Sequence, residues 1–248
     1  MTKHIVNFSG GKDSTCMLLK MLELQMQIDY IIFCDTTKEF PQVYDHIEKV
    51  KSFIKKNYDK EITTLKAKYS FDYYMFEYQK IKGSRIGEKG YGWSSMQIRW
   101  CTQALKKQVV NQFINNLHDD VIQYIGIAYD EESRHLKVKN NNSIVHPLYE
   151  WKITEAQALA YCLEKGFDYE GLYEHFSRLS CWCCPLKSLD ELRAMYKYYP
   201  KLWEQLKEMD HRSKNSYRKD LSIDDLELRF RLEELERKDL FFNKKKIF

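Results

Sequence analysis

The stretch that decides the fold lies close to the N-terminus and runs Ser9-Gly10-Gly11-Lys12-Asp13-Ser14-Thr15. The apolar run before it, residues 4–8, predicts a buried strand. The residues after it, 16–26, carry apolar side chains at helical spacing and predict a helix. The stretch is therefore expected to form a tight turn between a strand and a helix, where two adjacent glycines let the backbone approach a ligand closely.

Such a turn favours a bound anion. The first N–H groups of a helix have no partner within the helix, and the helix dipole adds partial positive charge at the same end. Lys12 adds a full charge, and Ser9 and Ser14 add hydroxyl donors. We interpret the stretch as a phosphate-binding loop; the alternative is an ordinary turn with a helix cap. The Walker loop is excluded, because that motif has four residues between its first glycine and its Gly-Lys pair.

Length and composition bound the class of protein. The 248 residues suffice for one large α/β domain or a domain with an appendage. A net charge of +4 neither marks nor excludes a nucleic-acid binder. The first residues run directly into a predicted strand, and no apolar run is long enough to cross a bilayer. We expect a cytoplasmic protein with no membrane partner.

The order of predicted elements indicates an α/β fold. Strands are expected at residues 30–34, 61–65 and 121–125, and a helix over 43–54 separates the first two. This alternation predicts a doubly wound, mainly parallel sheet. Asp35 follows a strand, where ligands bind in such sheets, so it is a candidate contact to a nucleoside; capping a helix is the alternative. Further helices are expected over 189–196, 200–209 and 223–237. We predict a nucleotide-binding domain over residues 1–150 and a helical C-terminal region over 151–248, packed on that domain and carrying a cysteine cluster.

Seven cysteines in a cytosolic chain suggest metal or thiol chemistry. Cys181 and Cys184 have the C-x-x-C spacing that lets two thiolates reach one metal. Cys101 begins a predicted helix, where a thiolate is favoured, although a buried apolar cysteine is equally consistent. Cys183 is a further candidate ligand. Three or four thiolates suit a 4Fe–4S cluster; zinc is the alternative, with His146 or His175 completing its site.

These motifs together resemble the phosphoadenylyl-sulfate (PAPS) reductase family, within the adenine nucleotide α-hydrolase superfamily. Residues 9–14 resemble its phosphate-binding PP-loop, residues 99–102 its central cysteine helix, and residues 126–134 a segment whose arginine contacts phosphate or sulfate. Residues 146–151 are similar to a block that precedes the C-terminal helices. Residues 180–184 look like the cysteine motif of phage-type members and of the sulfurtransferase subunit of DNA phosphorothioation.

The resemblance implies a set of site residues. The cofactor would be ATP with Mg²⁺, or PAPS or adenylyl sulfate, and the catalytic residues would be Lys12, Asp13 and Arg134. For Arg134, a surface salt bridge with Glu131 or Asp130 is the alternative. The nucleotide would be bound by Ser9, Gly10, Gly11, Lys12, Asp13, Ser14, Asp35, Gly126 and Arg134, and the metal or cluster by Cys101, Cys181, Cys183 and Cys184.

Three functions follow as expectations. The first is ATP-dependent adenylylation and sulfur transfer to an unidentified acceptor, with a sulfur or electron donor protein as partner and nucleic acid as one candidate acceptor. The second is a reductase of PAPS or adenylyl sulfate; family reductases use a nucleophilic cysteine near the C-terminus, and here only Cys183 could replace it. The third is a non-catalytic nucleotide-binding module with structural zinc. A basic cluster, formed by Arg212, Lys214, Arg218 and Lys219, either contacts phosphates or is simply solvated.

Overall fold

The computed structural model describes residues 1–81, 85–137 and 141–245. Its contacts group the chain into two units. The first comprises residues 1–70 and 102–181, and the second comprises residues 71–101 and 182–248. The organisation predicted from the sequence, with a boundary at residue 150, stays a prediction.

A five-stranded parallel sheet organises the first unit, in the order β3-β2-β1-β4-β5. The strands are β1 (Lys3–Asn7), β2 (Tyr30–Asp35), β3 (Ile62–Lys66), β4 (Val121–Ile125) and β5 (Ile144–Val145). The predicted doubly wound α/β fold is confirmed. The strand order reverses between β1 and β4, and ligands of such sheets bind outside the carboxyl ends of the strands at this point.

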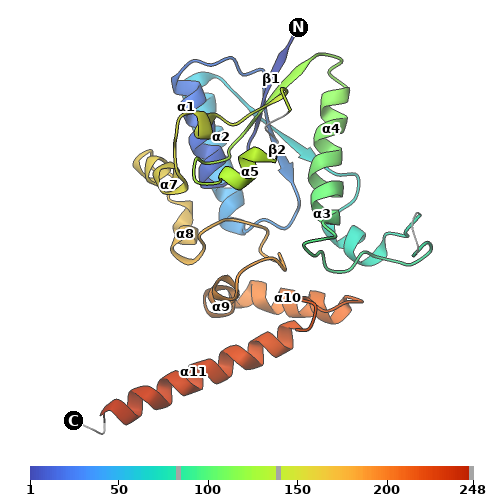
Figure 1. Cartoon of the computed structure of the whole chain (residues 1–248), viewed down its shortest axis with the longest axis vertical. Coiled ribbons are helices and arrows are strands. Elements are labelled where there is room, and N and C mark those ends of the chain that lie inside the picture. The colour runs from blue at the N-terminus through green and yellow to red at the C-terminus, as the bar shows by residue number, and fades with distance from the viewer. Residues whose placement is uncertain (82–84, 138–140, 246–248) are drawn as a thin grey trace. The chain divides into compact units, whose positions relative to one another are not determined.

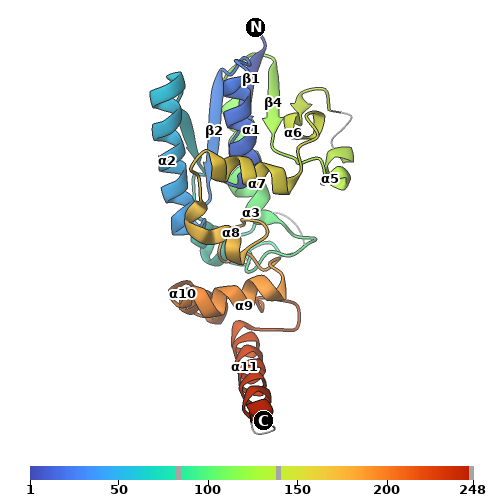
Figure 2. The same ribbon diagram turned by 90° about the vertical axis from the view of Figure 1, so that its left-hand side faces the viewer.

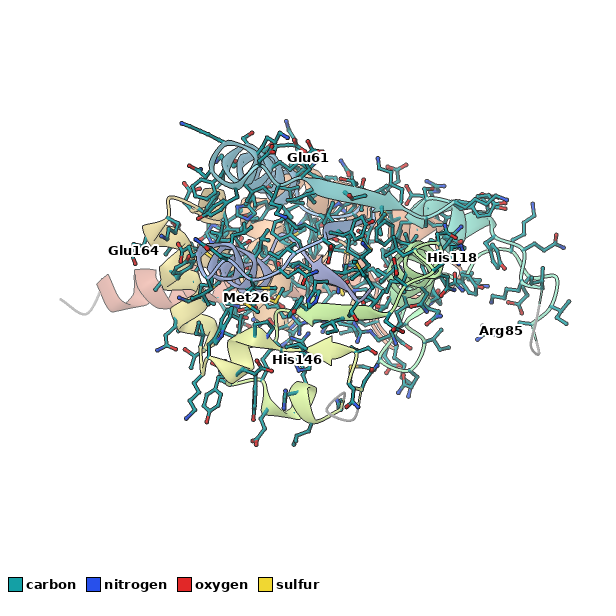
Figure 3. All side chains as sticks on the ribbon, turned by 90° about the horizontal axis from the view of Figure 1, so that it is seen from above. Met26, Glu61, Arg85, His118, His146 and Glu164 are labelled. Atoms are coloured by element: carbon teal, nitrogen blue, oxygen red, sulfur yellow. The ribbon has the colours of Figure 1, made fainter. Side chains whose placement is uncertain are left out.

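Helices cover both faces of this sheet (Figures 1 and 2). On one side lie α1 (Lys12–Glu23), α2 (Pro41–Tyr58) and α7 (Glu155–Glu164), and on the other lies α4 (Gln108–Asn115), continuous with the π-helical turn η2 (Gln103–Lys107). Figure 3 shows the same division from above: Met26, just after α1, and Glu164, at the end of α7, lie across the sheet from His118, just after α4. Shorter helices complete the unit: α5 (Glu132–Leu136), α6 (Pro147–Glu150), η3 (Tyr169–Gly171) and α8 (Leu172–His175).

The core of the first unit follows from the sequence pattern. Ile5 and Val6 of β1 are fully buried, as are Met17 and Leu18 of α1. The predicted stripe on α2 is buried as well, and it consists of Val43, Ile47, Val50 and Ile54. Burial of these side chains supplies the main driving force for the layered arrangement.

The second unit is mostly helical. It contains η1 (Tyr73–Glu77), most of the short α3 (Trp100–Thr102), α9 (Leu189–Tyr198), α10 (Pro200–Arg212) and α11 (Ile223–Lys245). Trp203 and Phe230 are buried between its helices. Asp210 joins three segments, because it accepts hydrogen bonds from the Trp93 indole (2.7 Å) and from the Ile223 amide (2.8 Å). Among the described residues, no helix is both long and apolar enough to cross a membrane.

Candidate functional site

The loop between β1 and α1 has the backbone of an anion site. Gly10 has φ +77°, and a Cβ there would lie 3.1 Å from the Val43 and Ile47 side chains. Within the described part of the chain, no group accepts a hydrogen bond from the amides of Gly10, Gly11 or Asp13. These donors at the start of α1 are therefore available to a phosphate.

Hydroxyl groups hold this loop in place. Ser14 Oγ accepts from the Ser9 amide at 3.1 Å and donates to the Gly11 carbonyl at 3.0 Å. The Ser9 and Ser14 hydroxyls are themselves 3.0 Å apart. The amide of Lys12 donates to the Tyr173 hydroxyl at 2.7 Å. The loop is therefore shaped before any ligand arrives.

Gly126 lies directly against the loop. It follows β4, the neighbour of β1, and a Cβ added there would lie 2.9 Å from Ser14 N and 3.0 Å from the Asp13 carbonyl carbon. These contacts are to backbone atoms, which cannot move aside as the end of a flexible side chain can. Position 126 therefore accommodates only glycine. This geometry brings the 126–134 segment to the phosphate-binding loop, while contact of Gly126 with a nucleotide stays a prediction.

Lys12 is enclosed by polar groups, with only 3 % of the residue exposed. Its Nζ lies 3.3 Å from Glu155 Oε1, 3.5 Å from Asp13 Oδ2 and 3.3 Å from the Ser177 carbonyl. It also lies 5.4 Å from the centre of the Tyr173 ring. The ammonium group is thus fixed at the mouth of the loop.

Three carboxylates meet beside this lysine. Asp13, Glu131 and Glu155 each offer an oxygen, and these atoms lie within 4.8 Å of one another. Asp13 Oδ1 is buried and has no hydrogen-bond partner in the described structure. Burial raises the pKa of Asp13 to about 6; Glu155 and Glu131 add to the rise and Lys12 opposes it. Carboxylate oxygens in such a group are suitable ligands for Mg²⁺.

The sequence interpretation missed Glu131 and Glu155 as members of this group. Glu155 begins α7, whose N-cap is Thr154, and α7 packs along α1. The capping pattern predicts the helix but not its neighbour, so no local signal could have placed Glu155 beside Asp13. Tyr173 was missed for the same reason.

Two predicted nucleotide contacts are engaged within the protein. Arg134 forms an ion pair with Glu131, which is the alternative that the sequence left open. Asp35 accepts from the Thr37 amide at 2.8 Å and from the Tyr44 hydroxyl at 2.7 Å. Burial alone would raise the pKa of Asp35, but these hydrogen bonds and Lys66 outweigh it and lower the pKa. Nucleotide binding by Arg134 and Asp35 stays a prediction.

The candidate metal ligands are distributed between the units at their boundaries. Cys181 ends the first unit, whereas Cys101, Cys183 and Cys184 belong to the second. Within the second unit, burial raises the pKa of the Cys184 thiol and the nearby Cys101 adds to the rise, while Lys187 lowers it. Of the described residues, only Asp13, Glu131 and Glu155 bring three candidate ligand atoms within 4.8 Å of one another, so metal binding by the cysteines stays a prediction.

Cys183 is enclosed, with only 1 % exposed, and its neighbour Trp182 is also buried. The two remaining buried cysteines, Cys16 and Cys162, are fully enclosed, and burial raises the pKa of each to about 12. Thiols that stay protonated are inert, so the structure gives Cys16 and Cys162 packing roles.

The basic cluster has intramolecular roles. Lys214 donates to the Gly90 carbonyl at 2.6 Å, the Arg218 guanidinium donates to the Lys187 carbonyl, and Arg212 lies 4.2 Å from the centre of the Phe76 ring. Three members of the cluster therefore hold segments of the second unit together. Contact of the cluster with phosphates stays a prediction.

Comparison with known proteins now decides the family. The profile of the phosphoadenosine phosphosulfate reductase domain matches residues 3–187. The chain belongs to this family. An uncharacterized protein of Methanocaldococcus jannaschii is 30 % identical over 213 residues, which are 81 % of this chain and 40 % of that protein. The chain thus spans about two fifths of the length of this curated relative.

A solved structure is also similar to this member of the PAPS reductase family. It is the U34-tRNA thiolase NcsA from Methanococcus maripaludis with its 4Fe–4S cluster. The match has a TM-score of 0.45 and 17 % identity, and it covers 82 % of this chain and 69 % of that one.

Proposed function

We propose that this chain is an enzyme that binds ATP with Mg²⁺, adenylylates an acceptor and exchanges the adenylate for sulfur. One observation carries the proposal: a preshaped anion loop meets a buried lysine and three carboxylates at the carboxyl ends of β1 and β4. Free loop amides suit phosphate oxygens, and the carboxylates suit the cation that accompanies them.

The reaction assigns a role to each group. The loop amides and Lys12 hold the phosphates and stabilise the negative charge that develops when pyrophosphate leaves. Asp13, with Glu131 and Glu155, holds Mg²⁺. An acceptor oxygen attacks the α-phosphorus and becomes adenylylated, and sulfur then displaces AMP. Arg134 provides a second phosphate contact when the bound nucleotide displaces Glu131 from the Arg134 guanidinium.

The cysteines are proposed to hold a 4Fe–4S cluster, with zinc as the alternative metal. Cys101, Cys181 and Cys184 are the ligands, with Cys183 a further candidate. The cluster, when bound, supplies a site from which sulfur can be delivered. The donor of that sulfur is a partner protein, and nucleic acid is one candidate acceptor.

The reductase alternative is less well supported. It needs a nucleophilic thiolate, and its only candidate, Cys183, is 1 % exposed. A non-catalytic module would not need three carboxylates beside the loop lysine.

Pyrophosphate release tests the proposal. The full chain, incubated with ATP, Mg²⁺, a sulfide source and candidate acceptors including transfer RNA, should release pyrophosphate and AMP. The Lys12→Ala variant should release pyrophosphate at least about ten-fold more slowly than the wild type. Sulfite release from PAPS with a thiol donor, without pyrophosphate release from ATP, would identify the reductase instead.

A further inference from the structure

A buried histidine lies on the face of α2 that packs against the phosphate-binding loop. The structure describes α2 throughout, and His46 is the one polar side chain among its buried residues. His46 is 1 % exposed, and its Nε2 lies 3.0 Å from the hydroxyl oxygen of Thr15, at the start of α1. Thr15 is fully buried as well. A polar pair is costlier to bury than an apolar contact, so the pair requires a reason beyond packing.

The hydrogen bonds fix which atom carries each proton. Thr15 Oγ1 has a single proton, which it donates to the Gly11 carbonyl at 3.0 Å. It therefore accepts from His46, so Nε2 of His46 carries a proton. The other ring nitrogen, Nδ1, is buried and has no hydrogen-bond partner in the described structure. Burial lowers the pKa of His46 to about 4; Lys49 adds to the fall and Asp168 opposes it. The imidazole is therefore neutral at neutral pH.

The Gly11 carbonyl is the end of this chain of hydrogen bonds. It accepts from the Thr15 hydroxyl, the Thr15 amide and the Ser14 hydroxyl, each at 3.0 Å. These donors fix the plane of the peptide that joins Gly11 to Lys12. Because that plane includes both Cα atoms, it also sets the point from which the Lys12 side chain extends. The bond from His46 directs the Thr15 proton toward this carbonyl.

Aromatic rings hold the imidazole of His46 in its orientation. The Tyr169 ring packs on it with centroids 4.2 Å apart and 31° between the planes. The Phe167 ring meets it edge-on at 5.5 Å, and both aromatic residues are buried. On the loop side, a Cβ added at Gly10 would lie 3.1 Å from apolar side chains of α2. The histidine is thus fixed against the loop from both sides.

We propose that His46 is a positioning residue of the nucleotide site, which acts through Thr15 to hold the Gly11–Lys12 peptide in the geometry that binds phosphate. This inference rests on the proposed function and adds to it a residue that touches neither ATP nor Mg²⁺. His46 transfers no proton, since its Nε2 proton stays in the bond to Thr15. A loop that is ordered before binding loses less freedom when ATP binds, and its affinity is higher for that reason.

Two variants at position 46 separate positioning from packing. His46→Phe keeps a ring in the aromatic contacts and removes both the Nε2 donor and the unpartnered Nδ1, so it should not lower the melting temperature. It should bind ATP with Mg²⁺ roughly three- to ten-fold more weakly, which is the range that one hydrogen bond contributes. His46→Gln, whose side-chain amide offers an N–H near the position of Nε2, should regain most of the affinity. Calorimetric titration of the full-length chain measures these affinities.

The route through Thr15 gives a further readout. Thr15→Val removes the hydroxyl and keeps the shape of the side chain, so it should weaken ATP binding at least as much as His46→Phe does. The two losses should not add in the double variant, because residues that act through one another are coupled. His4→Phe is the matched control. His4 Nδ1 lies 2.7 Å from the Tyr124 hydroxyl near the other end of β1, and this variant should bind ATP as the wild type does.

Four results would overturn the inference. If His46→Phe binds ATP as tightly as the wild type, His46 has no positioning role and the proposed function stands. If His46→Phe loses affinity and thermal stability together, the histidine only supports the fold. If the losses of His46→Phe and Thr15→Val add fully in the double variant, the effect does not pass through Thr15. If the wild type binds no ATP, this inference and the proposed function both fail.

Discussion

At the scale of single residues, Asp13 links the site to pH. Its pKa is about 6 in the folded protein and below 4 when unfolded, so the folded state binds more protons between these values. Asp13 therefore lowers stability as pH rises from 4 to 6, and the loss persists above pH 6. A loss of folding stability of this kind is expected for a buried carboxylate whose role is to bind a cation.

We expect Asp13→Asn to remove this dependence. The variant should be more stable than wild type at pH 7.5 by up to about 2–3 kcal/mol, and the difference should shrink toward pH 4. Urea unfolding at both pH values measures it. A difference that is equal at pH 4 and pH 7.5 would show that the Asp13 carboxyl titrates normally.

Gly126 provides a steric prediction at the same scale. Gly126→Ala would force a methyl group against the Ser14 amide and the Asp13 carbonyl carbon, at 2.9 Å and 3.0 Å. We expect a loss of roughly 1–3 kcal/mol in unfolding free energy and weaker ATP binding, because β4 and the loop must move apart. Thermal melting and calorimetric titration check both effects. A variant with wild-type values in both would contradict the close approach.

At the scale of elements, α8 supports the phosphate-binding loop. Tyr173, in α8, accepts the hydrogen bond of the Lys12 amide at 2.7 Å. Tyr173→Phe leaves that partly buried N–H without its partner, which costs about 1–3 kcal/mol. We expect lower thermal stability, with ATP affinity also reduced because the loop is less well held. Unchanged melting would show that the hydroxyl has no role in shaping the loop.

The second unit depends on a similar junction. Trp93→Phe removes the indole N–H that Asp210 accepts at 2.7 Å, while Asp210 still accepts from Ile223 at the start of α11. We expect a loss of about 1–3 kcal/mol, because Asp210 is buried and one oxygen loses its donor. Urea unfolding measures the loss. The matched variant Trp151→Phe, at a half-buried position in the first unit, should cost less.

The elements themselves were predictable wherever the signal is local. The loop sequence, the apolar strands and the stripe Val43 to Ile54 each specify their own structure through periodicity and glycine placement. Glu155 and Tyr173 were not predictable as site residues. Each reaches its partner only after distant segments pack, and a helix cap or a turn looks the same in sequence whether or not its neighbour is functional.

At the scale of the whole molecule, the switch in strand order explains why these residues meet. The order β3-β2-β1-β4-β5 brings the loops after β1 and β4 side by side, so Asp13 and Glu131 converge although their segments are far apart in sequence. Family membership over residues 3–187 agrees with this arrangement. The fold positions the site, and the side chains define its chemistry.

Calorimetric titration of ATP with Mg²⁺ into the full-length chain tests the central claim most directly. The wild type should bind ATP, Lys12→Ala should bind at least about ten-fold more weakly, and binding should weaken as pH falls below 6, where Asp13 is protonated. Lys20→Ala, a lysine on the same helix outside the loop, should bind as the wild type does. Equal affinity for wild type and Lys12→Ala would contradict the account.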